Sequence, residues 1–323
     1  MRSLLIILIA LLAAGVPLNA VAQGARNFTG RYGGWALIVP YLHVGWQRMG
    51  INFSLDVPIV VSGDASLRQS PVDLQIKETK LLMGEIGFDV RSGSRLSFFG
   101  RAAGDVRHHA TAVTSIVPAN ASFLSPTTWG SPNLEWWRIE GGGGVAFWGT
   151  WALVGGVRWD HLQLRLENPT NGANEGHLDP STVYSADFRA KMRLPYLGLQ
   201  IVGGRSRASV LYSPWAWTDF KLPFRLSAGQ ATARNAAGEE GKYSLSSGGY
   251  FLEGSFEYDL RMRGRMILGV WATGSLMRFT GEGDYDLVRQ DQGGAPTVVT
   301  SVSGESTYSR HTLTFGLSAK YPF

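Results

Sequence analysis

The chain has 323 residues, contains no cysteine and carries a formal net charge of +5. The absence of cysteine excludes disulfide scaffolds, thiolate metal sites and cysteine nucleophiles. The basic residues are scattered through apolar stretches, which argues against a nucleic-acid-binding tail, and a mean hydropathy near zero argues against a bundle of membrane-spanning helices.

Residues 1–22 have the pattern of a secretory signal peptide. Arg2 supplies the positive charge, residues 4–14 form an apolar stretch, and Ala20-Val21-Ala22 fits a signal-peptidase site. The apolar stretch is short for a membrane-spanning helix, so we expect cleavage rather than an anchor. Residues 23–323 are expected to form one domain, because no later apolar run approaches the roughly 18 residues that a helical span needs.

Apolar and polar residues alternate along most of the mature chain, which is typical of β-strands with two different faces. Between Leu82 and Val106, two such strands flank a short turn at Ser92-Gly93-Ser94 and predict a hairpin. Similar alternation predicts ten strands, at residues 33–57, 72–92, 95–108, 135–148, 150–167, 191–204, 206–222, 245–261, 265–286 and 307–323. The phase of the first segment changes near Gln47 to Gly50, so one bulged strand or two strands, and twelve strands in all, are open alternatives.

Tight turns near Gly93, Gly149, Gly204 and residues 262–264 alternate with long polar links at residues 108–134, 168–190, 227–243 and 290–306. This asymmetry, with Trp and Tyr near the strand ends, is typical of an antiparallel up-and-down β-barrel in the bacterial outer membrane, with short periplasmic turns and long outer loops. A soluble β-sandwich also alternates, but its polar face would not need Arg and acidic residues on the same strand. We expect Tyr321 and the terminal Phe323 to form the signal that the barrel assembly machinery reads.

The polar faces of these strands are predicted to form a paired, largely filled lumen, because barrels of eight to ten strands are mostly filled by their own side chains. The residues expected in this lumen network are Arg101, Asp105, Arg138, Glu140, Arg158, Asp160, Glu253, Glu257, Asp259 and Arg261.

Two short stretches resemble the omptin family of ten-stranded outer-membrane proteases. Residues 191–199, Lys-Met-Arg-Leu-Pro-Tyr-Leu-Gly-Leu, resemble an omptin strand with a basic residue followed by Pro-Tyr-Ile-Gly-Leu. Residues 212–215, Tyr-Ser-Pro-Trp, resemble that family's Tyr-Ser-Gly-Trp. The resemblance implies a ten-stranded barrel, and it covers the architecture of about half of the mature chain.

The catalytic residues of the omptins do not carry over. The resemblance places an Asp-x-His pair after the second stretch, and this chain has Asp219 but Lys221 in place of the histidine. The resemblance also places an acidic pair in the loop above the second hairpin, whereas residues 108–134 contain no Asp or Glu. Without an acid–base pair to activate water, we expect no omptin-like proteolysis and no catalytic residue.

No cofactor or metal site is expected. Glu282, Asp284 and Asp286 share one strand face and could offer oxygen ligands to Ca²⁺, but a calcium cage needs more ligands, so a solvated rim is the favoured interpretation. The adjacent pair His108-His109 would point to opposite faces of a strand and is interpreted as part of a polar loop.

Arg189, Lys191 and Arg193 alternate in phase with Leu197 and Leu199, which are expected to face lipid. They predict a basic ladder just above the apolar belt, at the height of the lipopolysaccharide phosphates, which arginine binds well. Omptins also use basic residues in this neighbourhood for lipopolysaccharide, and general solvation of the rim is the alternative.

The leading functional hypothesis is a structural or interaction barrel with a filled lumen, in contact with outer-membrane lipid and lipopolysaccharide. The alternatives are a narrow porin-like channel and a surface hydrolase with an altered site. The sequence names no protein partner.

Overall fold

The computed structural model describes residues 36–59, 68–92, 95–109, 114–118, 127–129, 133–167, 185–221, 224–228, 231–235, 248–263, 266–290 and 297–322. The predicted signal peptide and Phe323 lie outside these ranges. No helix of the described ranges is long and apolar enough to cross a bilayer.

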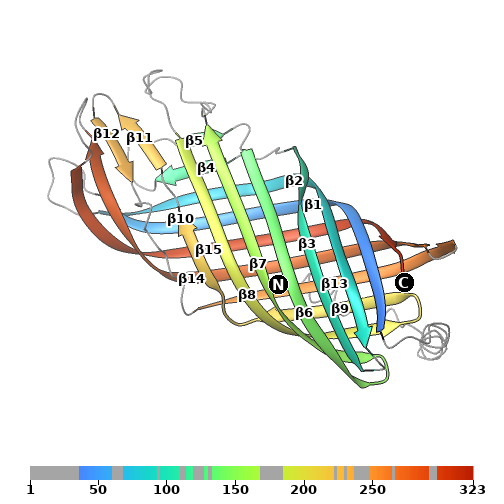
Figure 1. Cartoon of the computed structure of the whole chain (residues 1–323). Coiled ribbons are helices and arrows are strands. Elements are labelled where there is room, and N and C mark those ends of the chain that lie inside the picture. The colour runs from blue at the N-terminus through green and yellow to red at the C-terminus, as the bar shows by residue number, and fades with distance from the viewer. Residues whose placement is uncertain are drawn as a thin grey trace.

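Ten antiparallel strands form a closed ring, as predicted, and Figure 1 shows their common tilt. The ring strands are β1 (Ala36–Ile59), β2 (Arg68–Ser92), β3 (Leu96–His109), β6 (Asn133–Trp148), β7 (Trp151–Glu167), β8 (Ser185–Gly203), β9 (Ser206–Ser213), β13 (Gly248–Arg263), β14 (Met266–Gln290) and β15 (Thr297–Lys320). β1 closes the ring by pairing with β2 on one side and with β15 on the other, so that Tyr41 lies opposite both Gly87 and Lys320.

Five short strands extend the wall at one end of the ring: β4 (Thr114–Pro118), β5 (Thr127–Trp129), β10 (Trp217–Lys221), β11 (Phe224–Ala228) and β12 (Ala231–Asn235). We call this end the loop end. Connections of two or three residues join β2 to β3, β6 to β7, β8 to β9 and β13 to β14 at the opposite end, which we call the turn end (Figure 1). Gly149 and Gly204 take positive φ angles of 54° and 39° in two of these turns, a conformation that other residues adopt only at a cost.

The alternative of twelve strands is wrong, because β1 is one continuous strand of 24 residues. Its side chains keep alternating through Gln47 to Gly50, and the only irregularity there is a bulge where Met49 and Ile51 meet β2. What changes is the chemistry of each face. The outward face passes from Leu42, Val44 and Trp46 to Arg48 and Asn52, while the inward face passes from His43 and Gln47 to Met49, Ile51 and Phe53.

We infer that this exchange marks the point at which the barrel wall leaves the membrane. A tilted strand crosses a bilayer with about 9–11 residues, so a strand of 24 residues extends well beyond it. Toward the turn end the wall presents apolar side chains to lipid and polar ones to the interior. Toward the loop end the order is reversed, as in a water-soluble β-barrel.

A charged residue on the outward face of β1 should therefore be costly at one height and harmless at another. Leu42 lies in the middle of the apolar outward run and is 47% exposed, whereas Asn52 lies on the same face beyond the exchange. We expect Leu42→Arg to lower the free energy of unfolding by about 2–4 kcal/mol, the cost of a basic side chain at the bilayer midplane.

Asn52→Arg is the matched control, and we expect it to change the free energy of unfolding by less than about 0.5 kcal/mol. Urea-induced unfolding of both variants in lipid vesicles measures the difference. Equal losses from the two variants would contradict the proposed membrane boundary.

Candidate functional site: the barrel interior and the outer wall

The interior of the barrel has two levels that follow from the exchange of faces. The level toward the turn end carries ionised side chains. The level toward the loop end is an apolar core of buried residues from eight of the ring strands. Its members are Met49, Ile51, Phe53, Leu81, Met83, Leu134, Trp136, Leu162, Leu164, Phe188, Ala190, Met192, Leu194, Phe251, Met277, Phe279 and Tyr308.

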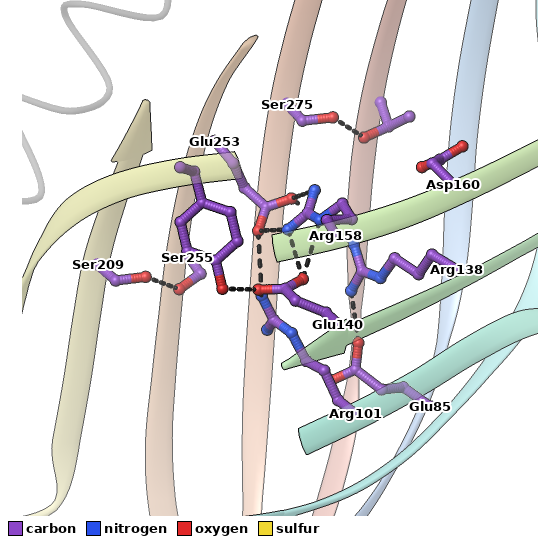
Figure 2. Close-up of polar contacts among 12 residues, drawn as sticks. Glu85, Arg101, Arg138, Glu140, Arg158, Asp160, Ser209, Glu253, Ser255 and Ser275 are labelled. Atoms are coloured by element: carbon purple, nitrogen blue, oxygen red, sulfur yellow. Dashed lines mark hydrogen bonds and ion pairs between the residues drawn. The ribbon is translucent and has the colours of Figure 1, made fainter. Parts of the chain in front are cut away.

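The centre of the polar level is a group of ion pairs around Arg158 of β7 (Figure 2). Its guanidinium donates Nη1 and Nη2 to the two carboxylate oxygens of Glu253 on β13, at 2.7 Å each. Its Nε donates to Oε2 of Glu140 on β6 at 2.9 Å. All three side chains are buried, and a buried guanidinium with two carboxylate partners keeps its donors satisfied.

Two further arginines extend this group, which we call the central network. Arg101 of β3 donates Nη2 to Oε1 of Glu140 at 2.6 Å, and Arg138 of β6 pairs with Glu85 of β2. The Tyr196 hydroxyl of β8 donates to the same Glu140 oxygen at 2.5 Å. Tyr196 reaches it past Gly156, where an added Cβ would lie 2.6 Å from the hydroxyl oxygen.

Next to the central network, on the side of the turn end, His43 of β1 lies between two carboxylates. Its Nδ1 is 3.0 Å from Oε1 of Glu85, and its Nε2 is 3.2 Å from Oε1 of Glu257 on β13. Lys320 of β15 pairs with the same Glu257 at 3.0 Å and with Asp259 at 2.8 Å. The ring of His43 also stacks on Trp271 of β14 at a centroid distance of 4.9 Å.

Three contacts join strands that stand on opposite sides of the ring. Asp89 of β2 pairs with Arg207 of β9 at 2.6 Å near the turn end. Asp160 of β7 accepts two hydrogen bonds, of 2.7 and 2.6 Å, from Arg310 of β15 at the boundary of the two levels. In the apolar core, the rings of Phe53 on β1 and Phe188 on β8 are 5.0 Å apart.

The structure places most of the predicted lumen residues on inward faces. Arg101, Arg138, Glu140, Arg158 and Glu253 lie in the central network, and Asp160, Glu257 and Asp259 belong to the other interior pairs. Asp105 accepts the backbone N–H of Trp136 at 2.9 Å. A bulge between Asp259 and Arg261 breaks the alternation on which the assignment of Arg261 rested, and its side chain lies outside the described residues.

Several interior partners were not predicted from the sequence, namely His43, Glu85, Asp89, Tyr196, Arg207, Arg310 and Lys320. Glu85 and Asp89 share the polar face of the predicted hairpin, and Arg310 and Lys320 share that of the last strand, so the alternation carried a signal for these four. His43, Tyr196 and Arg207 had no comparable signal. The inward faces of β1 and β8 mix polar, apolar and aromatic residues, and Arg207 shares the inward face of β9 with small or apolar residues.

On the outer wall, Arg189, Lys191 and Arg193 point outward from β8, in phase with the exposed Leu197 and Leu199. Their neighbours on β7 are Gln163, His161 and Trp159, and β10 flanks the ladder on the other side, with Trp217 opposite Arg193. Trp159 and Trp217 are exposed at one height with Arg193, which is the arrangement of an interfacial aromatic girdle.

Other predicted positions lie at the loop end. Asp219 and Lys221 lie on β10, opposite Lys191 and Arg189, but their side chains are outside the described residues. The side chains of Glu282, Asp284 and Asp286 on β14 and of His108 and His109 on β3 are also outside them. In the described part of the chain, no cluster of His, Asp or Glu has the geometry to hold a metal ion. At the turn end, Tyr321 is 43% exposed and its N–H donates to the carbonyl of Pro40.

Comparison with solved structures identifies the fold. The chain is similar to the outer membrane protease OmpT from Escherichia coli, with a TM-score of 0.56 and 12% identity, over 89% of this chain and 97% of that one. The translocator domain of the autotransporter NalP from Neisseria meningitidis matches with a TM-score of 0.37 and 9% identity, over 94% and 93% of the two chains. A FadL homologue from Pseudomonas aeruginosa matches with a TM-score of 0.27 and 12% identity, over 88% and 90%.

Neither a protein-family model nor a curated protein matches the sequence. The likeness to OmpT shows the fold, and the two lower scores add nothing to that conclusion. The ten-stranded ring with an extended loop end agrees with the resemblance found in two short stretches of sequence. The chain therefore has the fold of a bacterial outer-membrane β-barrel, and this fold is similar to that of OmpT.

Proposed function

We propose that this protein is a non-conducting outer-membrane barrel with a filled lumen, which acts at the cell surface in a structural or interaction role. The observation that carries the proposal is the set of three contacts between opposite walls, at three heights of the interior: Asp89 to Arg207, Asp160 to Arg310 and Phe53 to Phe188. A water-filled channel along the barrel axis would keep opposite walls apart.

The two levels support this proposal in different ways. The apolar core consists mainly of aliphatic and aromatic side chains, which offer water few hydrogen-bond partners, and the central network uses each of its carboxylates in ion pairs. A narrow channel, the alternative function, needs a continuous water path lined by unpaired charge. We assign the turn end to the periplasm and the loop end to the cell exterior, following the general rule for outer-membrane barrels.

In this proposal the omptin-like fold does not imply proteolytic activity. A fold hosts many functions, and function depends on the site. Lys221 stands where the resemblance expects a histidine, and residues 108–134 contain no acidic residue. These departures favour a barrel that keeps the scaffold of the omptins without an acid–base pair to activate water.

Planar-bilayer recording tests the filled lumen directly. We expect no discrete conductance steps from the refolded wild-type protein, because side chains from opposite walls meet in its interior. Heat-modifiable migration on a gel must first show that the sample is folded, and a trimeric porin in the same bilayer confirms that steps are detectable. Reproducible steps from folded protein would favour the narrow channel instead.

The Asp160–Arg310 pair offers a test of the interior that does not depend on conductance. Arg310→Met leaves the buried carboxylate of Asp160 without its bidentate partner, and we expect a loss of about 3–5 kcal/mol in the free energy of unfolding. Adding Asp160→Leu removes the buried carboxylate that has lost its partner, and this should restore most of the lost free energy of unfolding. Urea unfolding in vesicles measures both variants.

Arg278→Met is the matched control, because Arg278 is an exposed arginine on the outer wall of β14. Its replacement should change the free energy of unfolding by less than about 0.5 kcal/mol. If the double variant is no more stable than Arg310→Met alone, Asp160 and Arg310 are not paired in the folded barrel.

The exposed ladder of Arg189, Lys191 and Arg193 favours a second function, the binding of lipopolysaccharide phosphates by the outer wall. Its height beside Trp159 and Trp217 is that of the membrane interface. Arginine and lysine at that height can pair with the anionic headgroups. The assembly machinery remains a proposed partner through Tyr321 and Phe323.

Replacing Arg189, Lys191 and Arg193 together by alanine should weaken lipopolysaccharide binding at least tenfold, as measured by co-sedimentation or titration calorimetry of the refolded barrel. The matched control replaces Arg48, Lys80 and Arg278, which are exposed basic residues on other strands of the outer wall. The control removes the same charge, so a similar loss in both triple variants would mean general attraction rather than a site.

A further inference from the structure

A cavity of about 400 Å³ occupies the turn end of the barrel interior. It reaches the turn residues Arg95, Gly149 and Thr150, so it opens at the turn end. In the other direction it ends at Glu85, Arg138 and Glu140 of the central network. Its volume lies within the range of roughly 300–1,000 Å³ that is usual for small-molecule sites. The cavity is therefore a pocket that opens at the turn end and is bounded by the central network.

The charges that line this pocket do not balance. Its carboxylates are Glu85, Asp89, Glu140 and Glu257, and each of them already has a cationic partner. Arg91 and Arg95 line the same pocket, and no carboxylate of the described residues lies within ion-pair distance of either guanidinium. The pocket therefore has positive charge in excess of its own acidic groups.

Arg91 lies closer to the mouth than the Asp89–Arg207 pair. It follows Asp89 by two residues on the inward face of β2, so both side chains project into the interior. Asp89 is engaged by Arg207 of the opposite wall, at 2.6 Å. Asp89 and Asp259 both attract Arg91 from a distance, but Asp89 is paired with Arg207 and Asp259 with Lys320, at 2.8 Å. A dianionic group at the mouth would give the Arg91 guanidinium a direct partner. Arginine binds phosphate through two parallel N–H donors.

We propose that this pocket binds a small phosphorylated solute from the periplasm, with Arg91 donating to the phosphate group. The proposal rests on the function proposed above only for the sidedness of the barrel. A phospholipid headgroup of the inner leaflet offers the same chemistry. However, it lies outside the barrel wall, whereas Arg91 projects inside it, so the geometry favours a free solute.

Titration calorimetry with phenyl phosphate tests the site, using the refolded mature chain in zwitterionic detergent. We expect saturable binding to the wild-type protein, at least tenfold weaker binding to Arg91→Gln, and unchanged binding to Arg278→Gln, the matched loss of one arginine from the outer wall. Arg91→Lys keeps the charge without the bidentate donors, so its affinity should be intermediate. Each variant must show heat-modifiable folding, and Arg91→Lys carries the test if Arg91→Gln does not fold.

Absence of saturable binding to the wild type, or equal affinity in wild type, Arg91→Gln and Arg91→Lys, would overturn the site. Repeating the titration in nanodiscs of phosphatidylcholine, with and without phosphatidylglycerol, separates the two sources of phosphate. Loss of phenyl phosphate binding only in the presence of phosphatidylglycerol would assign the pocket to lipid and overturn the solute. Conductance recorded on the same sample keeps this test separate from that of the filled lumen, because a conducting barrel can still show Arg91-dependent binding.

Discussion

The closed ring of backbone hydrogen bonds is the constraint on which the rest of this structure depends. Within the bilayer no water pairs with a backbone N–H or C=O group, so a sheet in lipid must have no open edge. Here the closing pair is β1 with β15, which run antiparallel from Tyr41 opposite Lys320 to Leu55 opposite Ser306. Closure gives every ring strand an inward and an outward face, and all later features follow from what those two faces contact.

The surroundings of the outward face change along the strands from lipid to water, and the residue types on both faces change at the same height. Where lipid surrounds the wall, ionised groups have only the interior to occupy, and there they must find partners because an unpaired buried charge is costly. Where water surrounds the wall, the charged residues turn outward and the interior fills with apolar side chains. The ionised level and the apolar core are therefore two results of one rule, applied at different distances from the turn end.

Sequence alternation was sufficient to predict the ten strands because it records this rule directly. It was ambiguous in the first strand, where the hydrophobic phase changes at Gln47 to Gly50 although the backbone alternation does not. A change of surroundings along one strand and the start of a new strand both shift the phase of the apolar residues, so the sequence alone does not separate them. The strand predicted at residues 206–222 is wrong in its length, because the structure ends β9 at Ser213 and forms the separate strand β10 at Trp217–Lys221. The other four short strands at the loop end were missed for a related reason, since in wall segments beyond the membrane the contrast between the two faces is weaker.

The predicted interior residues lie mostly where alternation put them, but alternation says nothing about partners across the barrel. Arg158 and Glu253 are 95 positions apart, and Asp160 and Arg310 are 150 apart. Their pairing depends on how far each strand slides against the next around the whole ring, which no local pattern encodes. For the same reason Arg207 was not selected, because its partner Asp89 is on the opposite wall and the residues around it on β9 are small or apolar.

Buried ion pairs of this kind are weak evidence for stability, because the desolvation of both charges offsets much of their attraction.

Their clearer consequence is the specificity of the strand register. If one strand slipped by a single residue, its inward and outward residues would change places. Arg158 would then face lipid, and Glu140 and Glu253 would remain in the interior without it. Slippage by two residues would restore the faces but move Arg158 by nearly 7 Å along the strand, too far to keep two bonds to Glu253. The central network thus penalises a slip of β7 by one or by two residues, and this penalty favours the observed register over its nearest alternatives.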